Sequence, residues 1–157
     1  SSVLWLFEKN EDSTKNLKRE AMKNGISKNR LIFAKKMPLE LHLRRIQQAD
    51  LFLDTLPYNA HTTSSDALRM GLPVITCIGS SFASRVAASL LDAVKLPELI
   101  TTTPNEYQSL SIELAKNPIK LKAIKDKLAL NIYKSTLFDA PLFTKNLEHA
   151  YERMCDS

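Results

Sequence analysis

Short apolar runs alternate with longer segments of helical periodicity along the first two thirds of the chain. The runs are VLWLF at 3–7, LIFA at 31–34, DLFLD at 50–54 and PVITC at 73–77. Between and after them, apolar residues recur at helical spacing over the ranges 13–24, 39–48, 60–70 and 82–92. This order of strand, helix and strand is typical of a parallel sheet flanked by helices. We therefore expect an α/β fold.

Glycine and proline mark the ends of the expected helices. Gly25 stands where a C-terminal cap would close the first helix, and Gly71 with Pro73 closes the third in the same way. A short edge strand is expected near Leu99 and Ile100. The alternation therefore predicts a five-stranded pattern in which each strand precedes a helix.

The last third of the chain is expected to be helical. Thr103, Pro104 and Glu106 form a capping box with proline at the first helical position, and 117–118 repeat the start signal with Asn-Pro. The next helix carries one apolar stripe, and a final helix is expected from Pro141 to Met154. The stripe consists of Leu121, Ile124, Leu128 and Ile132.

Length and composition indicate one globular domain. The chain has 157 residues, of which 44% are hydrophobic and 25% charged, and it holds no apolar stretch long enough to span a membrane. Cys77 and Cys155 form neither a disulfide framework nor a metal-binding pair, which fits a reducing cytoplasm. The chain opens directly on a strand, so we expect a piece of a larger parent.

The net charge and the glycine content favour some classes of ligand site and exclude others. The 22 basic and 17 acidic residues leave a net charge of +5, which favours an anionic partner such as a nucleotide, a nucleic acid or a membrane surface. With only 3 glycines, neither a GxGxxG fingerprint nor a P-loop can be present. The sequence contains no GxSxG motif, so it does not support a hydrolase. It also contains no cluster of His or Cys residues that would support a metal site.

The segment LDTLPYNAHTTSSDALRMGLPVIT contains the most informative loop. In an open parallel sheet, ligands bind beyond the carboxyl ends of the strands, and this segment leaves a strand at Asp54. A helix then begins with His61, Thr62 and Thr63 in its first turn. The N–H groups of a helix N-terminus, together with threonine hydroxyls, can bind a phosphate.

Asp66 lies on the same face of that helix, where its carboxylate could accept hydrogen bonds from ribose hydroxyls. The alternative is that Thr62, Thr63 and Asp66 only cap the helix, because such residues are common in first turns. Spacing by itself favours capping.

A second candidate set lies in LELHLRRIQQAD. His42 and Arg45 are three residues apart and share one helical face. Histidine can stack on a nucleobase and arginine can pair with a phosphate or a carbonyl. The alternative is an amphipathic helix with a solvated charged face, and the pattern by itself favours it.

The lysines of residues 118–133 allow a further hypothesis. They form a charged face opposite the apolar stripe, so a solvated surface is expected, with contact to a nucleic acid or an acidic membrane as the alternative. No aromatic residues are interleaved with them. The lysines are Lys120, Lys122, Lys125 and Lys127.

Several separate motifs together resemble one known family. The segments SVLWL, LHLRRIQQADLFLDT, NAHTTSSDALRMGLPVIT, SFASRVAASLL and LFDAPLFTKNLEHAYERM occur in the order and spacing of the C-terminal catalytic lobe of the O-GlcNAc transferase and SPINDLY family of protein glycosyltransferases. The resemblance covers the chain from Ser2 to Met154.

The resemblance implies a Rossmann-like C-terminal lobe of GT-B architecture that binds a nucleotide-sugar. It places His61, Thr62 and Thr63 on the diphosphate and Asp66 on the ribose, with His42 and Arg45 bordering the nucleobase. Leu39 stands where animal members of the family carry a lysine. The catalytic residues, an N-terminal lobe and TPR repeats are expected outside this chain, so the chain alone should bind rather than catalyse.

The reaction that the resemblance implies is metal-independent transfer of a sugar, with inversion, from a nucleotide to a Ser or Thr hydroxyl of an acceptor protein. UDP-GlcNAc is the expected donor and no cofactor is expected. Plant SPINDLY enzymes use GDP-fucose, so a GDP-sugar is the alternative donor. The non-enzymatic alternative is a degenerate lobe that serves as a protein-interaction module. A nucleic-acid-binding module is the lowest-ranked hypothesis for the function.

Overall fold

The computed structural model describes residues 2–155 and divides into two compact units. Unit 1 runs up to His42, and unit 2 starts at Leu43. The organisation of the chain as a single domain stays a prediction.

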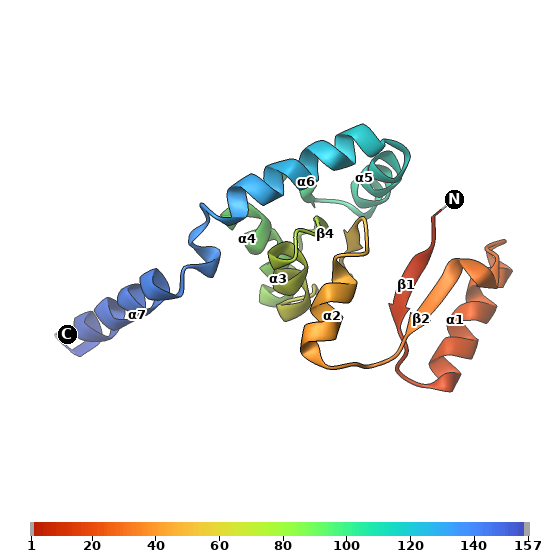
Figure 1. Ribbon diagram of the computed structural model, residues 1–157, viewed down its shortest axis with the longest axis horizontal. Helices are drawn as coiled ribbons and strands as arrows, with labels where there is room; N and C mark the ends of the chain where they lie inside the picture. The colour runs from red at the N-terminus through yellow and green to blue at the C-terminus, as the bar shows by residue number, and fades with distance from the viewer. Residues whose placement is uncertain (1, 156–157) are drawn as a thin grey trace. The chain divides into compact units, whose positions relative to one another are not determined.

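Unit 1 is a small βαβ arrangement (Figure 1). Strand β1 (Leu4–Phe7) pairs in parallel with β2 (Leu31–Ala34), so that Leu4 lies opposite Leu31. Helix α1 (Glu11–Lys23) and the 3₁₀ helix η1 (Lys28–Arg30) connect the strands. Asn10 caps α1 by accepting a hydrogen bond from the Ser13 N–H. The strand and helix expected here are thus confirmed, with α1 beginning two residues earlier than the pattern predicted.

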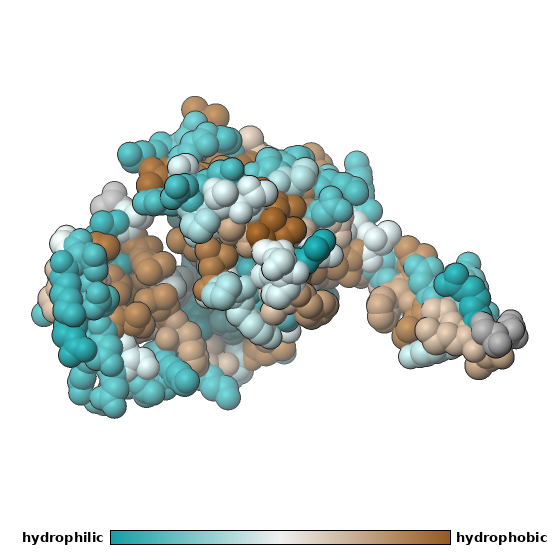
Figure 2. Space-filling view, turned by 180° about the vertical axis from the view of Figure 1, so that it is seen from behind, coloured by the Kyte–Doolittle hydropathy of each residue, from teal (hydrophilic) through white to brown (hydrophobic). Residues whose placement is uncertain are grey.

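Unit 1 buries little of its apolar surface. Leu31 is the only buried side chain among its described residues. Figure 2 shows the hydrophilic surface of α1 as a teal column at the left edge of the view. Trp5 on β1 is 39% exposed, and Phe7 is 59% exposed. The hydrophobic stabilisation of this unit by itself is therefore small.

Helix α2 (Leu39–Ile46) crosses the boundary between the units, and the sheet of unit 2 follows it. The three strands β3 (Phe52–Leu53), β4 (Val74–Cys77) and β5 (Ile100–Thr101) lie in the order β3-β4-β5, with both pairings parallel. All four residues of β4 are buried, as expected for a central strand covered on both faces.

Helices surround β4 in unit 2 (Figure 1). Contacts to β4 come from α3 (Thr62–Arg69), α4 (Val86–Ala93) and α5 (Pro104–Lys116). Helix α6 (Pro118–Ile132) packs on α5 and α3. The chain then passes through η4 (Thr136–Phe138) into α7 (Ala140–Cys155), which contacts η4 and buries none of its own described residues.

The capping signals of the C-terminal helices are confirmed. The Thr103 hydroxyl accepts from the Glu106 N–H, and the Glu106 carboxylate accepts from the Thr103 N–H, so the capping box forms as the sequence predicts. Asn117 accepts from the Lys120 N–H at the start of α6. These hydrogen bonds satisfy first-turn N–H groups that would otherwise lack a partner.

The core of unit 2 joins the helices to β4. Leu68 of α3 and Ile75 of β4 are fully buried in it, and so is Leu128 from the stripe predicted on α6. Fully burying one such side chain contributes about 1.5–3 kcal/mol. Because Leu68 belongs to α3, the core fixes the helix whose first turn carries the predicted phosphate site.

Two expected elements differ from the structure. Of the run at 50–54, only Phe52–Leu53 forms strand β3, and the Asp54 N–H adds one further hydrogen bond, to the Ile75 carbonyl, before the loop to α3 begins. The helix expected at 82–92 is divided into η2 (Phe82–Ser84) and α4. At the break, the Ser84 carbonyl accepts the N–H of Gly79 at 2.9 Å, and a Cβ atom at Gly79 would lie 2.5 Å from the Ser84 Oγ. Within residues 2–155, no helix is both long and apolar enough to cross a bilayer.

Candidate functional site

The first turn of α3 is open at its N-terminus. His61 is the N-cap residue, and its side chain makes no capping hydrogen bond. Thr62 and Thr63 follow as the first two helical residues, and both are exposed. Threonine side chains inside the first turn do not occupy the N-cap position, so the structure does not support the capping alternative. Exposed N–H groups and hydroxyls at a helix N-terminus form an arrangement that binds anions.

The loop from β3 to α3 folds around the carboxylate of Asp54. One oxygen, Oδ1, accepts the N–H groups of Thr55 at 2.8 Å and Ala60 at 2.7 Å. The other, Oδ2, accepts the hydroxyl of Thr76 at 2.6 Å. Asp54 is 4% exposed and Thr76 is fully buried on β4. The carboxylate therefore ties the two ends of the loop together and ties the loop to the central strand.

Burial governs the protonation of this cluster. Removal from water raises the pKa of Asp54 above its usual value of 3.8, against the opposing effect of the three hydrogen bonds and of nearby His61. The Tyr107 hydroxyl donates to the Asp54 carbonyl at 2.8 Å. Burial, with the charge of Asp54 second, raises the pKa of Tyr107 to about 12. The phenol therefore keeps its proton and its role as donor well above neutral pH.

Residues in the middle of the loop are held by further hydrogen bonds. The side-chain amide of Asn59 donates to the Thr55 carbonyl at 3.1 Å, and the Thr55 hydroxyl donates to the Tyr58 carbonyl at 2.6 Å. The Asn59 N–H donates to the carbonyl of Ala83, in the segment that follows β4. The loop is thus attached to two neighbouring segments rather than only to its own ends.

His61 lies between two aromatic rings. Its ring stacks on Tyr58 with centroids 5.1 Å apart and meets Phe82 edge to face at 6.0 Å. Its Nε2 lies 3.4 Å from the Ala83 carbonyl oxygen. Because a carbonyl can only accept, Nε2 is the donor in this contact. Tyr58 and Phe82 are 64% and 81% exposed.

Two buried polar atoms in this part of the chain have no hydrogen-bond partner among the described residues. They are Oδ1 of Asn59 and Oγ of Ser64, the third residue of α3. An unsatisfied buried polar group costs about 1–3 kcal/mol. Such costs gather at functional sites, where the surrounding structure tolerates them.

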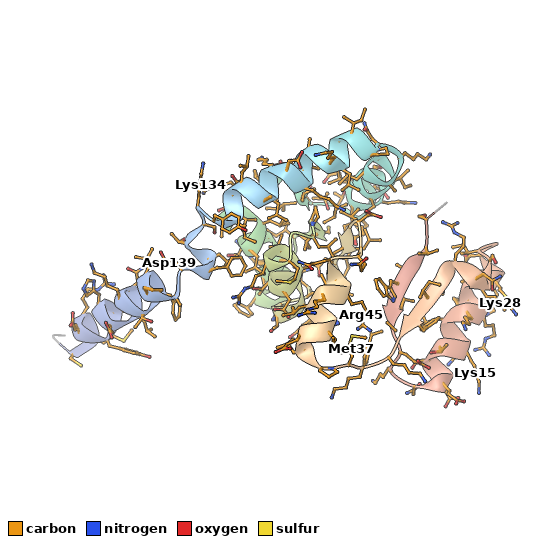
Figure 3. The ribbon with its side chains drawn as sticks, viewed as in Figure 1. Lys15, Lys28, Met37, Arg45, Lys134 and Asp139 are labelled. Atoms are coloured by element: carbon orange, nitrogen blue, oxygen red, sulfur yellow. The ribbon has the colours of Figure 1, made fainter. Side chains whose placement is uncertain are left out.

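The remaining predicted site residues lie on α3 and α2. Asp66 is half-buried on α3, one turn beyond the two threonines. His42 and Arg45 lie three residues apart on α2 and are both half-buried (Figure 3 labels Arg45). The structure brings His61, Thr62, Thr63 and Asp66 together on one short segment. The nucleobase role of His42 and Arg45 stays a prediction.

The lysine face of α6 is occupied by ion pairs. Each of its four lysines lies within 3.1 Å of a carboxylate oxygen. A lysine that is already paired offers less charge to a polyanion, so the structure gives no support to the nucleic-acid hypothesis. The pairs are Lys120 with Glu113, Lys122 with Asp126, Lys125 with Asp50 and Lys127 with Glu98.

No group of three or more His, Cys, Asp or Glu side chains within the described residues could hold a metal ion. Sequence reasoning identified the loop after β3 but missed the roles of Asp54, Asn59, Thr76 and Tyr107. The position of Asp54 at the carboxyl end of a strand was the one available signal. The partners of its carboxylate are 22 residues away, at Thr76, or in its own loop, and only the folded chain brings them into contact.

Comparison with known proteins identifies the family. The profile of Glycosyl transferase family 41 matches residues 1–147. A UDP-N-acetylglucosamine--peptide N-acetylglucosaminyltransferase from Caenorhabditis elegans is 34% identical over 153 residues, 98% of this chain. A probable enzyme of the same name, SPINDLY from Hordeum vulgare, is 38% identical over 113 residues, 72% of this chain.

A solved structure extends the comparison to the fold. A mutant of the O-GlcNAc transferase of Thermobaculum terrenum matches 97% of this chain with a TM-score of 0.89 and 33% identity. This match confirms the expected α/β fold of a GT-B lobe. The chain spans 30% of that structure and 13% and 12% of the two curated relatives. On the evidence of the family profile and the relatives, the chain belongs to glycosyl transferase family 41.

Proposed function

We propose that this chain is the nucleotide-sugar-binding lobe of a protein O-glycosyltransferase that transfers GlcNAc from UDP-GlcNAc to Ser or Thr. The observation that carries the proposal is the open N-terminus of α3, with His61, Thr62 and Thr63 at the end of a loop held by buried hydrogen bonds. The names of the relatives support UDP-N-acetylglucosamine as donor and a peptide as acceptor.

The chemistry of the reaction explains what this lobe contributes. The acceptor oxygen attacks the anomeric carbon with inversion while the bond to the diphosphate breaks, and the hydroxyl proton passes to a base expected outside this chain. Negative charge grows on the departing diphosphate. First-turn N–H groups and the threonine hydroxyls would meet that charge, and loss of one such preorganised donor typically costs about 3–4 kcal/mol of transition-state stabilisation.

Asp66 and α2 complete the proposed donor site. The carboxylate of Asp66 would accept hydrogen bonds from the ribose, and His42 with Arg45 would border the nucleobase. The lobe would act together with an N-terminal lobe and a TPR region of the parent protein. No metal is needed in this scheme, because protein donors take the place of a cation at the diphosphate.

Calorimetric titration with UDP and GDP in parallel, at moderate salt, tests nucleotide binding. We expect saturable binding of UDP, and loss of most of it in the Thr62→Ala/Thr63→Ala variant. The matched control is Thr144→Ala, which removes an exposed threonine hydroxyl from α7. Unchanged affinity in the double variant, with the fold intact, would contradict the proposal. Binding of GDP alone would favour a GDP-sugar such as GDP-fucose, and binding of neither would favour a protein-interaction module.

Metal independence has its own test. Transfer of radiolabelled GlcNAc to a Ser/Thr peptide by the full-length protein should be unaffected by EDTA. Recovery of lost activity on adding back Mg²⁺ or Mn²⁺ would show that a cation, not the protein alone, meets the diphosphate charge.

A further inference from the structure

The loop that carries the proposed nucleotide site depends on one buried carboxylate. Asp54 Oδ1 receives the N–H of Thr55 at the start of the loop and the N–H of Ala60 at its end. Ala60 is the residue immediately before His61. This one oxygen atom therefore joins the start of the loop to the residue two positions before α3.

The second oxygen of Asp54 connects the same loop to the core. Oδ2 receives the hydroxyl of Thr76, a fully buried residue of the central strand β4. The Asp54 carbonyl receives the hydroxyl of Tyr107 from α5. The loop is therefore located relative to β4 and α5 by hydrogen bonds that converge on one residue.

The contacts of Asp54 require its shape more than its charge. Both acceptor bonds at Oδ1 come from neutral backbone N–H groups, and the donor at Oδ2 is a neutral hydroxyl. An asparagine could keep this pattern, with its oxygen at the Oδ1 position and its NH₂ donating to the Thr76 oxygen. A negative charge near a diphosphate would also weaken anion binding rather than aid it. The hydrogen bonds of Asp54 therefore favour a role in positioning the loop over an electrostatic role in binding the nucleotide.

We propose that Asp54 is the positioning residue of the nucleotide site, which fixes the Ala60 N–H and thereby the first turn of α3 against β4. The inference rests on the proposed function. It assigns Asp54 no contact with the nucleotide and no proton transfer. It predicts that the carboxamide can replace the carboxylate, whereas a methyl group cannot.

The test compares four variants with the unaltered chain. Asp54→Ala removes the acceptor, Asp54→Asn keeps its shape, and Thr76→Val removes only the hydroxyl that meets Oδ2. Asp92→Ala is the matched control, because it removes an exposed carboxylate from α4. Each variant is titrated with UDP and GDP, and its fold is checked by circular dichroism.

We expect Asp54→Ala to weaken nucleotide binding by about tenfold or more, because small misplacements of donors reduce productive contacts steeply. Asp54→Asn should bind within about threefold of the unaltered chain, since its hydrogen bonds persist. Thr76→Val should fall between the two. Asp54→Asn that binds as poorly as Asp54→Ala would overturn the proposal, as would full affinity in a folded Asp54→Ala variant.

Hydrogen exchange at the Ala60 amide provides a second readout that needs no nucleotide. Exchange there should accelerate in Asp54→Ala and in Thr76→Val, and stay slow in Asp54→Asn and in the control. This measurement keeps the proposal testable if the unaltered chain binds neither nucleotide, an outcome that counts against the proposed function only. If Asp54→Ala does not fold, the proposal is tested by comparing the exchange rate of the Ala60 amide in Asp54→Asn with its rate in Thr76→Val. Slow exchange in Thr76→Val would then overturn the proposal.

Discussion

Unit 1 and unit 2 are built from the same kinds of elements, but they differ in how much they bury. Both have parallel strands joined through helices, and in both a helix ends at a glycine with positive φ, Gly25 in unit 1 and Gly71 in unit 2. Unit 1 buries one side chain among its described residues. Unit 2 buries a continuous hydrophobic cluster that includes Val74 and Ile75 of β4, and all four residues of that strand are buried.

The extent of burial determines where in the chain a side chain can be positioned precisely. The predicted phosphate site begins on α3, which is anchored in the core of unit 2 through Ala67 and Leu68. A well-packed core holds side chains in single rotamers and transmits small displacements. The side chains of a functional site on such an element can be positioned to within a fraction of an ångström. The buried hydrogen bonds of Asp54 are contacts of this kind.

The largest expected effect is on the core of unit 2. Leu68→Ala should lower the free energy of unfolding by about 2–5 kcal/mol, since the side chain is fully buried and leaves a cavity. Urea unfolding followed by circular dichroism measures it. The matched variant in unit 1 is Leu17→Ala on α1, where the leucine is 45% exposed and the loss should stay within about 0.5 kcal/mol. Equal losses in the two variants would contradict the contrast between the units.

The two positive-φ glycines allow one matched substitution in each unit. Gly25 and Gly71 have φ of 73° and 78°, and a Cβ atom at either would meet nothing within 4 Å. Each Gly→Ala change should therefore cost about 1–2 kcal/mol of local conformational strain and no steric clash. Trp5, the one tryptophan, reports on unit 1, whereas all four tyrosines lie in unit 2.

Fluorescence during urea unfolding should separate the two glycine variants. Gly25→Ala should shift the transition seen by Trp5, and Gly71→Ala should shift the transition seen by the tyrosines. If either variant shifts both transitions equally, the two units unfold as one cooperative body.

A third prediction concerns pH. Because burial raises the pKa of Asp54 in the folded chain, the folded state binds this proton more tightly than the unfolded state does. This group's contribution to stability is therefore present below pH 3.8 and is lost as pH rises through the raised value. The stability of the unaltered chain relative to Asp54→Asn should fall across that range and become constant above it.

Urea unfolding of both chains from pH 3.5 to pH 8 measures this difference, and Asp92→Asn serves as the exposed control. His61 and Tyr107, the titratable groups that act on Asp54 or are acted on by it, are retained in every variant. A difference that does not change with pH would mean that Asp54 has the same proton affinity in both states.

The smallest effect is expected on the surface of unit 2. Lys122 and Asp126 form an ion pair at i and i+4 on α6, and their side chains are 74% and 61% exposed. Lys122→Ala should change the free energy of unfolding by no more than about 0.5 kcal/mol, because exposed pairs are screened and alanine favours helix. Thermal unfolding at low and high salt measures it. A loss above 1 kcal/mol would mean that the lysine face stabilises the fold.

Much of the architecture was predictable because the signals are local. Gly25 and Gly71 marked two helix ends, and the Thr103 and Asn117 caps marked two helix starts, since each depends on residues within one turn. The break between η2 and α4 was not predictable. At the break, the Ser84 carbonyl accepts the N–H of Gly79, a contact that the helical preference of SFASRVAASLL does not encode.

For the site, the order of residues is enough to predict that a helix begins at His61, Thr62 and Thr63, because they are consecutive and follow a strand and a turn. Whether this N-terminus has a side-chain cap, and how Asp54, Thr76 and Tyr107 hold the loop before it, depends on the folded chain. Those partners are 22 and 53 residues from Asp54 along the chain. Hydrogen bonds over such separations depend on the packing of β4 and α5, which no local pattern of residues encodes.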